Sequence, residues 1–142
     1  MIGIVLFGHG KLAEEFVRAA EMILGPQTVI APIGVGPEEG EAAIFERLKR
    51  AIDETDRGEG VLLLTDMFGG TPMNMSCRYL DDARFEVVTG LNLASLIKAL
   101  TGRKEDVSLA TLATEVARYG RQDISVAGEL LRVEKKTEGP QG

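Results

Sequence analysis

At 142 residues, 44% of them hydrophobic, the chain has the size of one ordinary domain and can bury a core without disulfides or metal. Its net charge of −6 and its aromatic content of 5% argue against nucleic acid and anionic membranes as partners, because either would need a basic face. One cysteine excludes an intramolecular disulfide, one histidine leaves no zinc cluster, and the apolar runs are too short to cross a bilayer. We expect one cytoplasmic domain at residues 1–134 and a polar, disordered tail at 135–142.

The N-terminal stretch predicts a central strand that ends at the only histidine. Ile2 to Phe7 is a nearly continuous apolar run, which is typical of a strand buried on both faces of a parallel sheet. Gly8-His9-Gly10 then permits a tight turn, and helical periodicity begins at Lys11. A strand, a glycine turn and a helix N-terminus together favour anion binding, since the first N–H groups of a helix lack partners. The apolar stripe of this first helix comprises Ala13, Phe16, Val17, Ala20, Ile23 and Leu24.

The rest of the chain continues the alternation of strand and helix. The expected elements are a second strand at Thr28–Ile33, a helix from Pro37, a third strand at Val61–Thr65, a helix from Pro72 to about Tyr79 with Thr71 as its N-cap, a fourth strand at Phe85–Thr89, a helix after Asn92, a helix capped by Ser108, and a fifth short strand within Asp123–Val133.

This order predicts a doubly wound α/β fold, with a mostly parallel sheet and helices on both faces. In such sheets ligands bind beyond the carboxyl ends of the strands, where the strand order reverses. His9 follows the first strand and Asp66 follows the third. If those strands are neighbours, both residues meet in one crevice with the Gly69-Gly70 turn.

A histidine beside a carboxylate and a ring of N–H donors is suited to carrying a phosphoryl group. We expect Asp66 to accept a hydrogen bond from the protonated ring nitrogen of His9, which fixes the tautomer and leaves the other nitrogen free to attack phosphorus. Gly10 and the Gly69–Thr71 turn would donate hydrogen bonds to the phosphoryl oxygens. Nothing nearby supplies a base to activate water, so carriage is favoured over hydrolysis, and the chemistry needs no metal or organic cofactor.

Three apolar side chains near this crevice form a candidate docking rim for partner proteins: Met67, Phe68 and Met73. In a core they would be unremarkable, but a loop beside the site exposes them. Flexible methionine suits a surface that must fit two partners in turn.

The run Gly8 to Ala13 also matches the dinucleotide-binding pattern G-x-G-x-x-G/A after a first strand. That interpretation requires an acidic residue about 20 positions further on, at the end of the second strand. Val29–Val35 contains none. The match therefore remains weak.

The segment Phe7-Gly8-His9-Gly10, combined with the run from Thr65 to Asn74, resembles the enzyme IIA component of the mannose family of the bacterial phosphoenolpyruvate-dependent sugar phosphotransferase system. The resemblance implies that His9 takes a phosphoryl group from phospho-HPr and passes it to a histidine on a separate IIB component. It also implies that Asp66 pairs with the imidazole and that Thr71 stands near the phosphate. A homodimer in which the final strand crosses to the partner's sheet is a further implication.

Two other functions stay open at this point. One is a regulatory binding module whose phosphorylated and free forms bind different targets, in a system without a transporter. The other is the phosphoryl-donor subunit of a dihydroxyacetone kinase, whose first domain is similar to this fold.

Overall fold

The computed structural model describes residues 1–138, with side chains through Arg132. The elements in chain order are β1 (Gly3–His9), α1 (Leu12–Leu24), β2 (Ile30–Val35), α2 (Glu41–Thr55), β3 (Val61–Thr65), α3 (Gly70–Ser76), the short 3₁₀ helix η1 (Cys77–Tyr79), β4 (Phe85–Thr89), α4 (Leu93–Gly102), α5 (Leu109–Asp123) and α6 (Ala127–Glu138).

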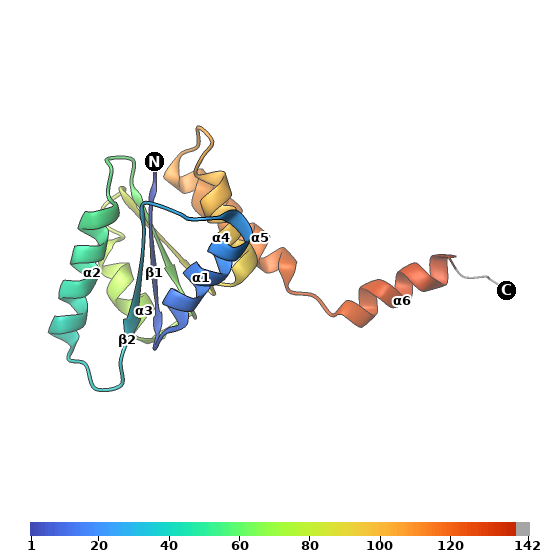
Figure 1. The fold of residues 1–142 in the computed structure, drawn as a ribbon, viewed down its shortest axis with the longest axis horizontal. Helices are drawn as coiled ribbons and strands as arrows, with labels where there is room; N and C mark the ends of the chain where they lie inside the picture. Colours follow the sequence, from blue (N-terminus) through green and yellow to red (C-terminus); the bar gives the residue numbers. More distant parts are fainter. Residues whose placement is uncertain (139–142) are drawn as a thin grey trace.

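The four strands form one parallel sheet in the order β2-β1-β3-β4, with helices covering both faces (Figure 1). The predicted α/β class is therefore confirmed. Because β1 and β3 are adjacent and run in the same direction, His9, the last residue of β1, and Asp66, the first residue after β3, lie at the same end of the sheet. The order of the strands therefore brings these two residues together.

Alternation along the strands divides the core into two layers. Val5, Phe7 and Leu63 point toward α2 and α3, whereas Leu6 and Leu64 point toward α1, α4 and α5. All five are at most 1% exposed, as expected for strands covered on both faces. Continuing the alternation from Val5 and Phe7 places His9 on the same face as α2 and α3.

Arg103 ties the opposite edge of the sheet together. Its guanidinium donates hydrogen bonds to the carbonyls of Ile2 (3.2 Å), Val29 (2.7 Å) and Thr28. Arg103 is only 4% exposed, and burial lowers the pKa of its guanidinium. These bonds connect the end of α4 to the starts of β1 and β2.

The bounds of β2 and the start of α2 differ from the sequence prediction. Strand β2 begins at Ile30 rather than at Thr28 and extends through Gly34 to Val35, and α2 begins at Glu41 rather than at Pro37. The delay of α2 has a local cause: the Glu39 carboxylate accepts the Gly36 N–H at 2.9 Å. This hydrogen bond holds the segment between β2 and α2 in a turn, so the helix starts only after it.

The predicted stripe of α1 is also partly wrong. Ala13 and Ala20 are buried, and Phe16, Val17 and Leu24 pack against the core. Ile23, however, is 61% exposed, although its neighbour Leu24 packs against the core.

The C-terminal segment is a helix, α6, and not the predicted fifth strand. It extends away from the sheet (Figure 1). Ile124 and Val126 suggested a strand, but the residues after them are mostly strong helix formers such as Leu, Glu and Lys. Part of the predicted tail, 135–138, belongs to α6, and 139–142 lie outside the described residues.

In the described part of the chain, no helix combines the length and the apolar character that crossing a membrane requires.

Candidate active site

The structure brings His9 and Asp66 into direct contact. One carboxylate oxygen, Asp66 Oδ2, accepts the backbone N–H of His9 at 2.9 Å and lies 2.8 Å from His9 Nδ1. Two contacts to the same oxygen fix both the position of the residue and the orientation of its ring. The carboxylate requires a proton on Nδ1, so the neutral ring presents an unprotonated Nε2.

The surroundings of Asp66 keep it ionised. Burial disfavours the charged form of this carboxyl, whose side chain is 9% exposed. The hydrogen bonds from the His9 backbone and ring outweigh burial and lower the pKa of Asp66. Asp66 is therefore a carboxylate at neutral pH and can balance positive charge that develops on the imidazole.

Gly8 makes room for this contact. A Cβ atom at Gly8 would lie 3.3 Å from Asp66 Oδ2 and 3.4 Å from its Cγ. The sequence indicated Gly8 only as part of a tight turn. The structure places it inside β1, where the absent side chain lets Asp66 approach the strand.

Gly70 lies against the other side of the imidazole. A Cβ built on Gly70 would lie 3.4 Å from His9 Cε1 and 3.6 Å from Nε2, and the residue has a φ of +83°. Both observations favour glycine here, since L side chains rarely adopt this backbone conformation. The His9 side chain is nonetheless 50% exposed, so a partner can reach it from solvent.

Helix α3 begins beside His9, at Gly70, two residues earlier than predicted. Gly69, not Thr71, is its N-cap, and the cap has no side-chain hydrogen bond. The Gly69 N–H donates to the Met73 sulfur at 3.1 Å, so Gly69 is not a free donor. With Pro72 carrying no N–H, the amides of Gly70 and Thr71 remain as the donors of the first turn.

Gly10 has a different role from the one predicted. Its N–H donates to the carbonyl of Val35 at 3.0 Å, so this amide is already occupied. Gly34 permits the contact, because a Cβ there would lie 1.9 Å from the Gly10 carbonyl oxygen. The sequence did not identify Gly34 or Val35 as site residues, since only the β1–β2 register brings them next to the His9 loop.

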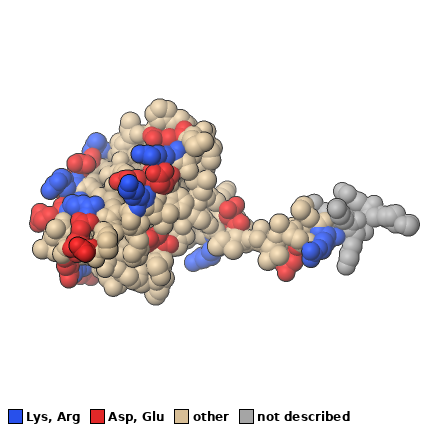
Figure 2. Space-filling view, turned by 60° about the horizontal axis from the view of Figure 1, so that its bottom comes forward, with Lys and Arg blue, Asp and Glu red and all other residues tan. Residues whose placement is uncertain are grey.

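The predicted docking rim is divided. Met67 is 54% exposed and Phe68 is 78% exposed, on the loop between β3 and α3. Met73 is half-buried, and its sulfur is engaged by Gly69. Figure 2 turns the site edge of the sheet toward the viewer and shows acidic and basic side chains interspersed beside a broad uncharged area.

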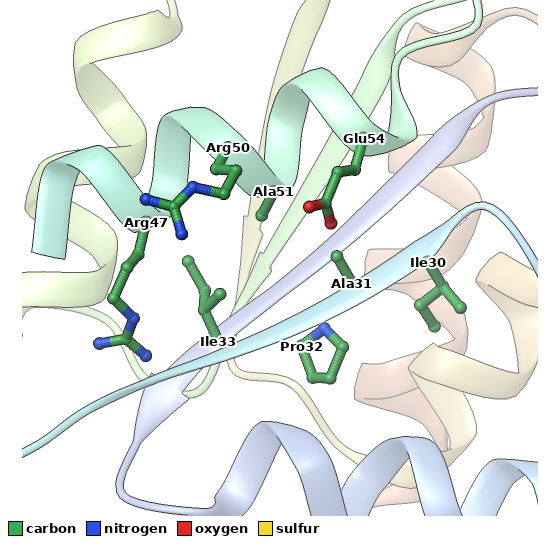
Figure 3. Close-up of a pocket in the computed structure, with 8 residues that line it drawn as sticks. All are labelled: Ile30, Ala31, Pro32, Ile33, Arg47, Arg50, Ala51 and Glu54. Atoms are coloured by element: carbon green, nitrogen blue, oxygen red, sulfur yellow. The ribbon is translucent and has the colours of Figure 1, made fainter.

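Another groove lies outside this site, between β2 and α2 (Figure 3). It has a volume of about 350 Å³, and Arg47, Arg50 and Glu54 line it together with residues 30–33 of β2. None of the predicted site residues lines it. Among the described residues, no three His, Cys, Asp or Glu side chains are grouped as metal ligands.

Comparisons with known proteins identify components of the bacterial phosphotransferase system (PTS). A family model described as the PTS system fructose IIA component matches residues 3–117. The mannose-specific EIIAB component of Escherichia coli K12 is 36% identical over 123 residues, which cover 84% of this chain and 38% of that protein. The fructose-specific EIIA component of Bacillus subtilis is 28% identical over 132 residues, covering 92% and 90%.

A solved structure agrees with these relatives. The mannose/sorbose-specific IIA subunit of the phosphotransferase system from Enterococcus faecalis has a TM-score of 0.78 and 28% identity, covering 88% of this chain and 93% of that one. The chain spans less than two fifths of the length of the Escherichia coli relative. The match to the family model nevertheless extends over most of the sheet and its helices, and the chain belongs to the mannose-type family of phosphotransferase system (PTS) IIA components.

Proposed function

We propose that this chain is a cytoplasmic phosphocarrier that accepts a phosphoryl group from phospho-HPr on His9 and passes it to a histidine of a IIB component. The observation that carries the proposal is the contact between His9 Nδ1 and the Asp66 carboxylate at 2.8 Å. That contact leaves Nε2 as the nucleophile, on a half-exposed ring that a second protein can approach. Family membership supports the same chemistry.

The transfer step needs no proton from solvent and no cofactor. The lone pair of His9 Nε2 attacks phosphorus while the bond from phosphorus to the donor's histidine nitrogen breaks, and that nitrogen keeps the bonding pair. The proton on Nδ1 stays in its hydrogen bond to Asp66, whose negative charge balances the phosphorylated imidazolium. Transfer to the acceptor is the same step with His9 as the leaving group.

Backbone amides stabilise the moving group. In the transition state of transfer, the phosphoryl group spreads negative charge over its three outer oxygens, so fixed N–H donors lower the energy of that state. The amides of Gly70 and Thr71 are at the start of α3, beside Nε2. We assign them, with the Thr71 hydroxyl, to the phosphoryl oxygens, and we withdraw the predicted role of the Gly10 amide.

Docking of the partners is assigned to Met67 and Phe68. Both side chains are exposed on the loop that carries Asp66, so a protein that reaches His9 would cover them. Burying a large apolar side chain contributes about 1.5 to 3 kcal/mol. The same rim serves donor and acceptor because each must bring a histidine to the same nitrogen.

We also propose that the chain forms a homodimer. Ile124, Val126, Leu130 and Leu131 are between 57% and 78% exposed, and all lie in or just before α6. Clustered apolar residues of this kind favour burial against a second protein surface. Leu131→Glu should shift the mass measured by light scattering from that of a dimer to that of a monomer, whereas an unchanged mass would count against the dimer.

The central experiment follows labelled phosphate from phosphoenolpyruvate through enzyme I and HPr onto this protein. We expect label that acid removes and base does not, as a phosphohistidine requires, and none on His9→Gln. Adding a IIB component should discharge it. Label that persists in His9→Gln would end the proposal.

A further inference from the structure

Among the side chains that the structure describes, several buried polar atoms lack a hydrogen-bond partner, and some of them are close in sequence to Asp66. Within the described residues, five buried side-chain polar atoms lack a hydrogen-bond partner: Thr65 Oγ1, Asp66 Oδ1, Ser76 Oγ, Thr89 Oγ1 and Arg103 Nε. Three of the five lie at the C-terminal ends of β3 and β4: Thr65 ends β3, Asp66 follows it, and Thr89 ends β4. Buried polar groups are normally paired, so such a cluster calls for a partner.

The Thr65 and Thr89 side chains lie side by side on two adjacent strands, β3 and β4. They are register partners in the parallel pairing of β3 with β4, so they project from the same face of the sheet. The two hydroxyls do not bond to each other, since both Oγ1 atoms are without a hydrogen-bond partner among the described residues. Two neighbouring buried hydroxyls of this kind are well placed to share one water molecule, which can hydrogen-bond to both.

The same end of the sheet positions the catalytic carboxylate. Thr65 is 0% exposed and immediately precedes Asp66, and its carbonyl accepts the Leu91 N–H at 3.0 Å. A displacement of Thr65 therefore moves both Asp66 and the loop after β4. Asp66 in turn holds the His9 ring through a single oxygen, so the angle of that ring depends on where β3 ends.

We propose that Thr65 and Thr89 bind one long-lived water molecule between their hydroxyls, and that this bridge makes them positioning residues for Asp66. The proposal rests on the proposed phosphocarrier function for its rate effect, but not for the water itself. Thr89 is the better residue to change, because it is on the edge strand and is only half-buried. Valine has the shape of threonine without the hydroxyl.

The first test uses the unmodified protein. Magnetization transfer from water should give a cross-peak of a long-lived water molecule at the Thr65 methyl group, and the cross-peak should persist in Thr89→Ser and vanish in Thr89→Val. Absence of such a water from the unmodified protein would overturn the proposal, whatever the variants do. This arm is informative even if His9 proves not to carry phosphate.

The second test measures the phosphorylation rate against phospho-HPr concentration. Thr89→Val should lower the maximal rate about tenfold, as small displacements of catalytic groups do, and leave the half-saturating concentration of phospho-HPr unchanged. Thr89→Ser should restore the rate. The matched control is Thr55→Val, since Thr55 is 2% exposed but its hydroxyl bonds within α2, and this variant should keep the full rate.

The two tests separate the possible failures. A full rate in Thr89→Val would refute the positioning role even with the water present. If Thr89→Val does not fold, the rate of Thr89→Ser and the water signal in the unmodified protein decide the question: loss of either refutes the proposal. If the unmodified protein accepts no phosphate, the phosphocarrier function has failed and the water test still stands.

Discussion

Replacing Asp66 with asparagine isolates the effect of its negative charge, since the two side chains have nearly the same shape. The amide oxygen can still accept both His9 hydrogen bonds that Asp66 Oδ2 now accepts, at 2.9 Å and 2.8 Å. What the variant loses is the charge facing the imidazolium that forms during transfer. The variant should therefore fold, bind its partners and transfer phosphate slowly.

The size of the effect follows from the strength of the hydrogen bonds. A hydrogen bond to a charged group contributes about 1.5 to 3 kcal/mol, compared with about 1 kcal/mol for a neutral one. The difference of about 1 to 2 kcal/mol applies to the ring contact, whose carboxylate side is nearly buried. It corresponds to phosphorylation that is about 5- to 30-fold slower at saturating phospho-HPr.

Rapid-quench phosphorylation with labelled phospho-HPr measures this rate. Asp82→Asn is the control. The pKa of the Asp82 carboxyl is lowered too, in this case by Arg84, but this ion pair is on the surface and distant in sequence from the His9 loop. The reasoning would be refuted if Asp66→Asn kept the full rate. A loss as complete as that of His9→Gln would also refute it, because charge alone cannot account for so large an effect.

The same substitution has a pH signature in stability. The pKa of Asp66 is lowered in the folded protein, so the unfolded chain binds the proton more readily, with a pKa of about 3.9. The stabilisation is complete above that value and is lost as pH falls through the lower folded pKa. Urea unfolding should show Asp66→Asn less stable at pH 7 and the gap closing below about pH 4; a gap that widens in acid would contradict this sign.

Three further predictions use matched variants. Gly70→Ala and Gly69→Ala should each lower the free energy of unfolding by about 1 to 2 kcal/mol, since both glycines have positive φ, but only Gly70→Ala should slow phosphorylation, because only its Cβ reaches the imidazole. Arg103→Met should cost about 3 kcal/mol in urea unfolding, because the carbonyls of Ile2 and Thr28 lose their donor while the Val29 carbonyl keeps the Ile4 N–H. The phosphorylation rate should not change, since Arg103 lies at the opposite end of the sheet from His9. Phe68→Ala should raise the half-saturating phospho-HPr concentration about tenfold or more without changing the maximal rate, whereas Met22→Ala, which removes an apolar side chain that is exposed on α1, should change neither.

The sequence was most informative where local pattern and fold depend on the same residues. The apolar runs of β1 and β3 favoured strands covered on both sides, and the alternation of strands and helices made the two strands candidates for neighbours. His9 and Asp66 follow directly from that, because each comes at the end of its strand. Their contact was predictable without coordinates.

The donors to the phosphoryl group were harder to predict, since they depend on which amides are already occupied. The Gly10 amide is taken by Val35 through the β1–β2 register, and the Gly69 amide is taken by a methionine sulfur. Neither contact has a signature in the order of residues. The free amides could be identified only after the paired ones were known.

The prediction of a strand in the C-terminal segment failed for a different reason. Ile124 and Val126 favour a strand, whereas the residues from Glu129 onward favour a helix, and no tertiary contact within the described chain decides between them. Local propensity then prevails, and α6 forms. The same isolation leaves its apolar residues exposed.

The central claim is that His9 carries phosphate on the ring nitrogen turned away from Asp66. Protein labelled with ¹⁵N at histidine and charged through phosphoenolpyruvate, enzyme I and HPr tests it directly by ³¹P and ¹⁵N NMR. We predict a phosphorus coupling at Nε2 of His9, with Nδ1 still protonated. Coupling at Nδ1, or phosphate on any other residue, would contradict the account.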